Sequence, residues 1–478
     1  MISDSTSPTL EEAEPELTLD ASTPSPSNQT HALESKAIRA TIWTVADYAA
    51  SMALRVASSM ILTRLLMPES FGLMTLVTTF IVGISLLSDI GLAPSVIQNP
   101  RGDDPVLLNT VWTLQVLRGL GIFIVSLALA WPISRFYDHR LLVLLPALAV
   151  NVVITSFYST NLLSMSRHMG VRRIFLLDFS TQALSLVITA GLAKLLHSVW
   201  ALILGAILST VYRLVLSYYR PLIPGIRNKF CWDKESVHSL VHFGKWIMLG
   251  TAFYFFAAQA DRLILGKLIS VSLLGVYGIA YQVSDVPRQV ISAFAQKVGY
   301  PFIAKVAHLP VSEFHAIFLM YRFRILLVGA AMLGLTVHVG PFLVTKMFDH
   351  RYHEAAWMVP ILALGLWHTL LYSTTMPALF SLGKSKYNAA GNVAYCVSAL
   401  VAIPAAFFFF KMPGAVIAVA AADFPLYLVT VFGASREKIS TWKQDLLTTA
   451  IFLVMLTAGL ALRVPFTNWK SIVHYGSH

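Results

Sequence analysis

The sequence contains few charged residues and almost no cysteine. Only 12% of its 478 residues are charged, whereas 56% are hydrophobic, and the mean hydropathy is +0.68. Soluble domains carry about 25% charged residues, so a chain this apolar requires a lipid bilayer as its solvent. The two cysteines, Cys231 and Cys396, are too few for a disulfide scaffold. The composition therefore predicts a protein that crosses a membrane many times.

The sequence also lacks the motifs of common membrane enzymes and pumps. It has no GxxxxGK[ST] phosphate loop, no HExxH, no GxSxG and no long outer loop that would house a catalytic domain. Two histidine pairs, His238 with His242 and His350 with His353, lie near predicted membrane surfaces, and we expect neither pair to bind a metal. We therefore predict no catalytic residue, no metal and no other cofactor.

Apolar segments of the length that crosses a bilayer, about 20 residues, run along most of the chain. Thirteen candidate spans are present, at 40–66, 71–97, 107–131, 141–164, 174–193, 197–219, 240–266, 271–296, 322–345, 356–381, 388–410, 413–432 and 445–464. The first twelve divide into six plus six, and an even number of spans gives both halves the same orientation. We predict an all-α membrane protein of 12–14 transmembrane helices, with two parallel six-helix lobes around a central cavity.

The spans also divide the chain into regions. Only 220–239 and 297–321 separate neighbouring spans by longer connections, and each has room for a surface helix. The predicted regions are a disordered acidic tail at 1–37, an N-terminal lobe at 38–219, a cytoplasmic linker at 220–239, a C-terminal lobe at 240–432, and an extra helix and tail at 433–478.

Loop charges predict how the chain sits in the membrane. With the N-terminus in the cytoplasm, nineteen loop Lys and Arg residues lie inside and ten outside, in agreement with the positive-inside rule. Because the net charge of +11 is spread over these short loops, we do not expect nucleic acid as a partner. The first 35 residues hold seven acids and no Lys or Arg, which predicts that the tail is disordered.

Two segments of the chain read alike. ILTRLLMPESFGL at 61–73 aligns without a gap with ILGKLISVSLLGV at 264–276, so that Gly72 coincides with Gly275 at an offset of 203 residues. A membrane half that occurs twice is typical of transporters, whose pathway runs between the halves.

Charges within the spans indicate where a site lies, because each costs about 2.5–3.5 kcal/mol or more at the bilayer centre. Arg55 lies in the middle of the first span, on the same face as Ser51 and Asp47. Since guanidinium binds phosphate bidentately, a cluster of arginines predicts an anionic substrate. The predicted substrate-binding residues are Arg55, Arg118, Arg262 and Arg288. The candidates for binding a coupling cation or proton are Asp47, Asp89, Asp261 and Asp285.

Four of these charges also have a structural interpretation. Asp285 and Arg288 are three residues apart, so they share a helix face on which they neutralise each other, and Pro287 between them is expected to kink the helix. Asp261 and Arg262 are adjacent and point to different faces, near the outer end of their span, where an interfacial role is the alternative.

The segments resemble a known family. LTRLLMPESFGLMTLV at 62–77, followed by SDIGLAPSVIQ at 88–98, resembles the opening of Wzx-type polysaccharide flippases. QADRLILGKL at 259–268, followed by LGVYGIAYQ at 274–282, resembles the opening of their second half. These proteins belong to the multidrug/oligosaccharidyl-lipid/polysaccharide exporter superfamily, and the resemblance covers roughly residues 38–440.

The resemblance implies a two-lobe exporter in the bacterial inner membrane. It would move an undecaprenyl-diphosphate-linked oligosaccharide unit from the cytoplasmic to the periplasmic leaflet by alternating access, for exopolysaccharide or lipopolysaccharide synthesis. The implied partners are the lipid-linked oligosaccharide, membrane lipids and a polysaccharide assembly complex. Because cavity cations vary between members of the family, no site residue is carried over from it.

Three alternatives remain open on the sequence. A drug or cation antiporter of the same superfamily would favour acids over cations in the cavity. A polyprenyl-sugar polymerase or ligase would require a large outer loop. A scaffold within a polysaccharide assembly complex would require neither feature.

Overall fold

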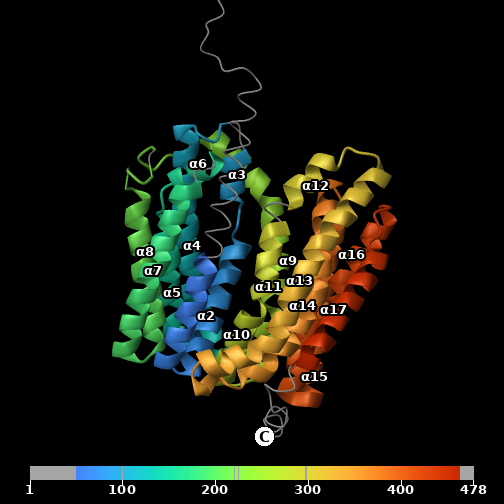
Figure 1. Cartoon of the computed structure of the whole chain (residues 1–478). Helices are drawn as coiled ribbons and strands as arrows, with labels where there is room; N and C mark the ends of the chain where they lie inside the picture. Colours follow the sequence, from blue (N-terminus) through green and yellow to red (C-terminus); the bar gives the residue numbers. More distant parts are fainter. Residues whose placement is uncertain are drawn as a thin grey trace, which may run out of the picture.

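A computed structural model of the chain describes residues 50–98, 101–168, 171–219, 221–223, 225–295 and 299–462. The described residues form helices joined by short turns, and none of them forms a strand. The predicted tail at 1–37 and the candidate residue Asp47 lie outside the described residues. The helices form two bundles that stand side by side, and we call them the N-lobe and the C-lobe (Figure 1).

Each lobe consists of long helices and short segments that break them. The N-lobe contains a helix at 50–65, α2 (Pro68–Leu87), α3 (Leu92–Gln98), α4 (Pro105–Phe136), α5 (Leu141–Ser156), α6 (Asn161–Arg167), α7 (Val171–Leu196) and α8 (Val199–Ser217). The C-lobe contains α9 (Lys234–Leu268), α10 (Val271–Ser284), α11 (Val286–Phe294), α12 (Tyr300–Val306), α13 (Val311–Met347), η2 (His350–Tyr352), α14 (Ala355–Ser381), α15 (Lys386–Ala421), α16 (Phe424–Arg436) and α17 (Trp442–Leu462).

Several predicted spans are broken helices rather than continuous ones. The span at 71–97 divides into α2 and α3 at Gly91, whose φ of 62° a residue with a side chain rarely adopts. The span at 141–164 bends by 65° between α5 and α6. Among the described residues, eight helices are long and apolar enough to cross a membrane, or nine if this bent pair counts as one span. The chain is therefore a multi-pass membrane protein, and the predicted number of thirteen spans is not confirmed.

The linker between the lobes is extended, although its length would have room for a surface helix. Residues 225–233 carry no helix, and their backbone bonds to side chains of the N-lobe. The Lys229 amide donates to Asn109 at 3.0 Å, and the Cys231 amide donates to Thr113 at 3.0 Å. Because α4 supplies both acceptors, the linker lies along the N-lobe up to the start of α9.

The two repeated segments form the contact between the lobes. A Cβ on Gly72 of α2 would collide with the carbonyl of Val271, and a Cβ on Gly275 of α10 would collide with the carbonyl of Pro68. Pro68 and Val271 are separated by the same 203 residues as the two glycines. The contact therefore has approximate two-fold symmetry, and the sequence repeat is used as an interface.

Two tyrosines reinforce this contact in the same symmetric manner. The Tyr137 hydroxyl, just after α4, donates to the carbonyl of Leu263 in α9 at 3.1 Å. The Tyr352 hydroxyl, after α13, donates to the carbonyl of Leu66 at 3.0 Å, at the end of the helix at 50–65. Arg351 adds two bonds at 3.3 Å to carbonyls of that helix, whose last carbonyls lack partners within it. We call the α2–α10 contact with these tyrosines the inter-lobe seal, and it closes the lower end in Figure 1.

The extra C-terminal helix, α17, is fixed to the C-lobe by a buried ion pair. Nη2 of Arg322 in α13 lies 2.6 Å from Oδ1 of Asp445, and the two side chains are 0% and 3% exposed. Gln444 accepts a second bond from Arg322 at 2.8 Å, and Trp367 donates to Thr449 of α17 at 2.9 Å. The predicted span began at Arg322, at the end of a loop. In the structure α13 begins eleven residues earlier, at Val311, so Arg322 lies within the helix and is buried in the C-lobe.

Asp445→Asn should destabilise the protein strongly. Breaking a buried ion pair costs about 3–5 kcal/mol, because the remaining charge is left without a partner. We expect a clear fall in melting temperature for the purified protein in lipid nanodiscs. Arg101→Gln removes a largely exposed pair with Asp104 and serves as the control. Equal melting temperatures for the two variants would contradict this interpretation of α17.

The double variant Tyr137→Phe/Tyr352→Phe should open the seal more often. Each lost hydrogen bond contributes about 0.5–1.5 kcal/mol, so the population with separated lower ends should rise several-fold. Spin labels at Arg135 and Lys346, which lie at the lower ends of different lobes, report this as a longer distance by electron–electron double resonance. Tyr218→Phe, which removes a bond to Phe157 inside the N-lobe, is the control. An unchanged distance distribution in the double variant would exclude a sealing role for these hydroxyls.

Candidate functional site

A pocket of about 320 Å³ lies between the lobes, and we call it the inter-lobe pocket. The N-lobe contributes Arg55 and a row of threonines on α2. The C-lobe contributes Arg262 from α9, Gln282 from α10 and Gln289 from α11. The pocket therefore brings together two predicted substrate-binding arginines that are 207 residues apart in the sequence.

Arg55 connects the two lobes across this pocket. Its Nη1 donates to Oε1 of Gln289 at 3.0 Å, and Nε2 of Gln289 donates to Asp285 at 2.9 Å. The Arg55 side chain is exposed, and it forms no ion pair with an acid of the described residues. Its charge is thus held by a neutral amide and remains available to an anion.

Arg262 is likewise without an ion pair in the described part of the chain. It donates to Gln259 at 2.5 Å, and its guanidinium lies 5.1 Å from the centre of the Tyr281 ring. The neighbouring Asp261 faces elsewhere, is 5% exposed and accepts the hydroxyl of Tyr277 at 2.5 Å. The two adjacent side chains therefore have different hydrogen-bond partners, although both line a cavity within the C-lobe.

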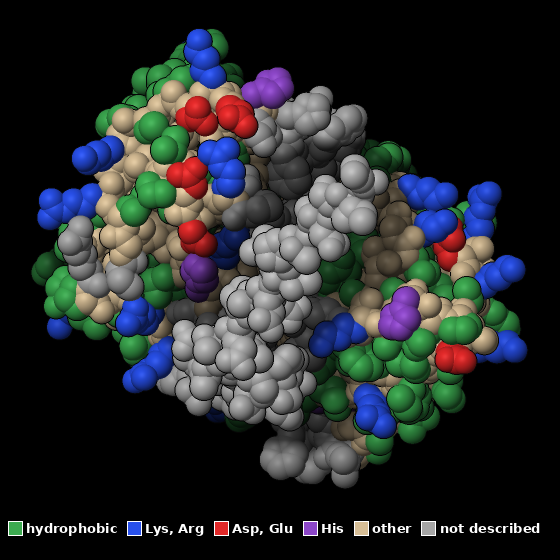
Figure 2. Space-filling view, turned by 90° about the horizontal axis from the view of Figure 1, so that it is seen from above, with side chains coloured by type: hydrophobic (Ala, Val, Ile, Leu, Met, Phe, Trp, Pro, Cys, Tyr) green, Lys and Arg blue, Asp and Glu red, His purple; other side chains and the backbone are tan. Residues whose placement is uncertain are grey.

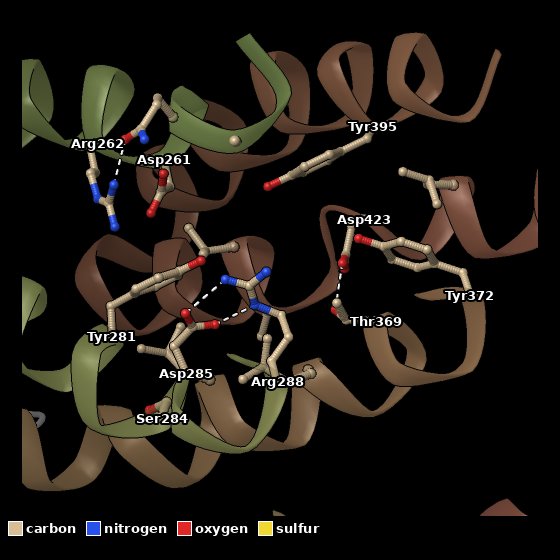
Figure 3. A pocket seen from close by; sticks show the side chains of 18 of the residues that line it. Asp261, Arg262, Tyr281, Ser284, Asp285, Arg288, Thr369, Tyr372, Tyr395 and Asp423 are labelled. Carbon is tan, nitrogen blue, oxygen red and sulfur yellow. Dashed lines mark hydrogen bonds and ion pairs between the residues drawn. The ribbon is translucent and has the colours of Figure 1, made fainter. Parts of the chain in front are cut away.

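Asp285 and Arg288 form a bidentate pair at a break in the helix. Nη2 of Arg288 lies 2.7 Å from one carboxylate oxygen of Asp285, and Nε bonds to the other oxygen (Figure 3). The break separates α10 from α11, with Pro287 in the first turn of α11, so the predicted kink and the predicted pairing are both confirmed. Asp285 neutralises Arg288, which leaves the positive charge of the inter-lobe pocket to Arg55 and Arg262.

Arg118 and Asp89 lie within the N-lobe, outside the lining of the inter-lobe pocket. Nε and Nη2 of Arg118 donate to the carbonyls of Ser88 and Ser85 at 2.9 and 2.6 Å. Its guanidinium lies 3.9 Å from a carboxylate oxygen of Asp89. These carbonyls belong to the C-terminal end of α2, where a cation satisfies groups that the helix leaves unpaired. Arg118 therefore stabilises the end of α2.

A second cavity of about 230 Å³ lies inside the C-lobe, and we call it the C-lobe pocket. It shares Gln259, Arg262, Tyr281 and Asp285 with the inter-lobe pocket. Other polar residues that line it are Ser284, Arg288, Thr369, Tyr372, Asn392, Tyr395 and Asp423 (Figure 3). Of these, only Arg288 was singled out from the sequence, because tyrosine, asparagine and threonine in a span fit ordinary packing equally well.

Asp423 lies at a break between α15 and α16. One carboxylate oxygen accepts the Thr369 hydroxyl at 2.5 Å, and the other bonds to the imidazole of His368. Both partners come from α14, so this pair ties α14 to the broken helix. Both carboxylate oxygens of Asp423 therefore have hydrogen-bond partners.

The two pockets together are suited to bind an anion. Each guanidinium offers five N–H donors in a rigid plane that matches phosphate or carboxylate oxygens. Arg55 and Arg262 approach the inter-lobe pocket from different lobes, so one bound anion would contact both halves of the protein.

Comparison with known proteins gives one family and several relatives. The model of a family described as "Polysaccharide biosynthesis protein" matches residues 61–357. The chain is 21% identical over 349 residues to the succinoglycan biosynthesis transport protein ExoT of Rhizobium meliloti. This alignment covers 72% of this chain and 68% of ExoT. It is 22% identical over 278 residues to the lipopolysaccharide biosynthesis protein WzxC of Escherichia coli, and this alignment covers 57% of this chain and 56% of WzxC.

The fold is shared with a solved transporter. The lipid II flippase MurJ, in an inward closed conformation, superposes with a TM-score of 0.66 at 13% identity, covering 91% of this chain and 96% of MurJ. At this identity the likeness shows the arrangement of helices in two lobes.

Proposed function

This chain belongs to the polysaccharide biosynthesis protein family, and from that premise we propose that it flips an oligosaccharide linked to undecaprenyl diphosphate across the bacterial inner membrane. The names of its relatives support the proposal: ExoT is a transport protein for succinoglycan synthesis, and MurJ is a lipid II flippase. The cargo would then be used for exopolysaccharide or lipopolysaccharide synthesis, with a polysaccharide assembly complex as a further partner.

The observation that carries this proposal is a pair of arginines in the inter-lobe pocket that have no ion pair within the part of the chain that the structure describes. A lipid-linked diphosphate cannot cross hydrocarbon unaided, because its charges would lose their water. Arg55 and Arg262 replace that water with guanidinium donors from the two lobes. Neither guanidinium forms an ion pair with an acid of the described residues, so the pocket attracts an anion and disfavours a cationic drug.

The charged turns support one orientation in the membrane. Figure 2 shows Lys and Arg side chains distributed around the upper face of both lobes. Turns and helix ends at this face carry Arg101, Arg167, Lys305, Lys384 and Arg436. The positive-inside rule therefore supports a cytoplasmic upper end and a periplasmic inter-lobe seal.

Transport then requires the seal to open while the opposite end closes. A diphosphate that enters from the cytoplasm would displace Gln289 from Arg55, and the lipid tail would remain in the bilayer. Rocking of the lobes about the bound cargo would break the contacts of Tyr137 and Tyr352 and expose the pocket to the periplasm.

Of the acids predicted to couple transport to an ion, we retain Asp261 among the described residues, and Asp47, which lies outside them, stays a prediction. Asp89 lies beside Arg118, and Asp285 is paired with Arg288. The Asp261 carboxylate has no ion pair among the described residues and lines the C-lobe pocket. An unpaired carboxylate at this depth is suited to bind a proton or a small cation.

Arg55→Ala should abolish polymer export while the protein still inserts in the membrane. Arg55→Lys should retain part of the activity, because an ammonium keeps the charge and loses the bidentate geometry. Export is measured by complementation of a deletion strain, together with the leaflet in which the lipid-linked intermediate accumulates. Arg135→Ala, which changes an arginine at the lower end of α4 outside both pockets, is the control. Normal export by well-expressed Arg55→Ala would refute the proposed role.

A further inference from the structure

Three tyrosines of the C-lobe point their hydroxyl groups into the C-lobe pocket. Tyr281 comes from α10, Tyr372 from α14 and Tyr395 from α15, and Figure 3 shows them facing the pocket from different sides. Each ring presents an apolar face together with a polar edge. The transport of a diphosphate alone gives no reason for this arrangement.

Neutral polar groups in this pocket are available to a ligand. Neither the Tyr281 hydroxyl, nor the Tyr395 hydroxyl, nor the Asn392 amide makes a hydrogen bond to another described residue. A ligand hydroxyl placed against such a group gains a hydrogen bond worth about 0.5–1.5 kcal/mol. These groups are therefore suited to a ligand that brings hydroxyls of its own.

Each of the three carboxylates that line the pocket already accepts a hydrogen bond. Arg288 donates to Asp285, His368 and Thr369 bond to the two oxygens of Asp423, and Tyr277 donates to Asp261. Across the described residues, no group of three His, Cys, Asp or Glu side chains is placed to hold a metal ion. The unused donors and acceptors are thus mainly neutral, which favours a polyhydroxyl compound over a metal ion.

The size and position of the pocket fit one sugar ring. Its volume of about 230 Å³ is below the roughly 300–1,000 Å³ of pockets that take drug-sized ligands. It adjoins the inter-lobe pocket through Arg262 and Tyr281. A diphosphate bound to Arg262 would therefore place its attached sugar at the entrance of the C-lobe pocket.

We propose that the C-lobe pocket binds the monosaccharide that is directly attached to the diphosphate. The C–H faces of the sugar would pack on the tyrosine rings, and its hydroxyls would bond to Tyr281, Tyr395 and Asn392. This inference rests on the proposed function, since it assigns the second part of the same cargo. The pocket would then select among first sugars, while the rest of the oligosaccharide stays in the inter-lobe space.

The test compares ligands with and without a sugar on the full-length protein in nanodiscs. The probes are farnesyl diphosphate and its esters with glucose, galactose, N-acetylglucosamine or cyclohexanol. At least one sugar ester should bind about tenfold more tightly than the cyclohexyl ester, which fills space without hydroxyls. This comparison uses the unmodified protein and does not depend on the folding of any variant.

Variants then locate the gain in affinity. Tyr395→Phe and Asn392→Ala should each remove most of the advantage of the sugar ester and leave the affinity for farnesyl diphosphate within about twofold. Arg262→Ala should weaken all of the probes. Tyr218→Phe, in the N-lobe, should weaken none of them.

The outcomes separate the two proposals. If farnesyl diphosphate binds and no sugar ester gains over the cyclohexyl ester, the saccharide site is refuted and the proposed flippase stands. If a sugar gain persists in both Tyr395→Phe and Asn392→Ala, the sugar binds elsewhere and the inference is likewise wrong. If no probe binds at all, the anion site fails and the saccharide site fails with it.

Discussion

A charge within the bilayer must have a partner, and this constraint sorts the arginines of the chain. Four arginines inside the lobes lie beside an acid: Arg118, Arg213, Arg288 and Arg322. Arg55 and Arg262 pair with none of the acids in the described ranges, and both line the pocket between the lobes. Since an unpaired charge is tolerated only where water or a ligand reaches it, we propose that the transport pathway runs past these two arginines. The paired arginines, by contrast, hold each lobe together as the lobes move.

The repeated segments of the two lobes pack against each other symmetrically, whereas the side chains that line the pockets differ between the lobes. Gly72 and Gly275 occupy equivalent positions on both sides of the inter-lobe seal. The same offset of 203 residues places Ala258 at the position of Arg55. Ala258 lines the C-lobe pocket, where an arginine would occupy much of the cavity. The helix at 50–65 therefore contributes the charge of Arg55, whereas the equivalent part of α9 contributes the small side chain of Ala258 and leaves space in the C-lobe pocket. Two similar lobes can in this way offer different surfaces to the different parts of one head group.

How far the sequence predicts the site depends on how rare each residue type is in a membrane span. Charges are rare there, so Arg55, Arg262 and Arg288 were singled out as candidates from the sequence alone. Tyr395 and Asn392 are uncharged, so they gave no signal until the fold placed them around one cavity. Helix breaks were predicted where proline stands next to a charge, as at Asp285, and were missed at Asp423, because the proline that follows it was not weighed. Burial of Arg322 depended on its partner 123 residues later, which no local pattern reveals.

A transporter must also release its cargo, which limits how many free arginines a site should hold. Each further guanidinium on a diphosphate would strengthen binding and slow its release on the far side. The pair of Asp285 and Arg288 lies on the boundary between the two pockets and removes one arginine from that set. Gln289 bonds to Arg55 and to Asp285, so a cargo that binds Arg55, as we propose, would compete with this internal partner. The same internal bonds can re-form as the cargo leaves, which stabilises the empty site and favours release.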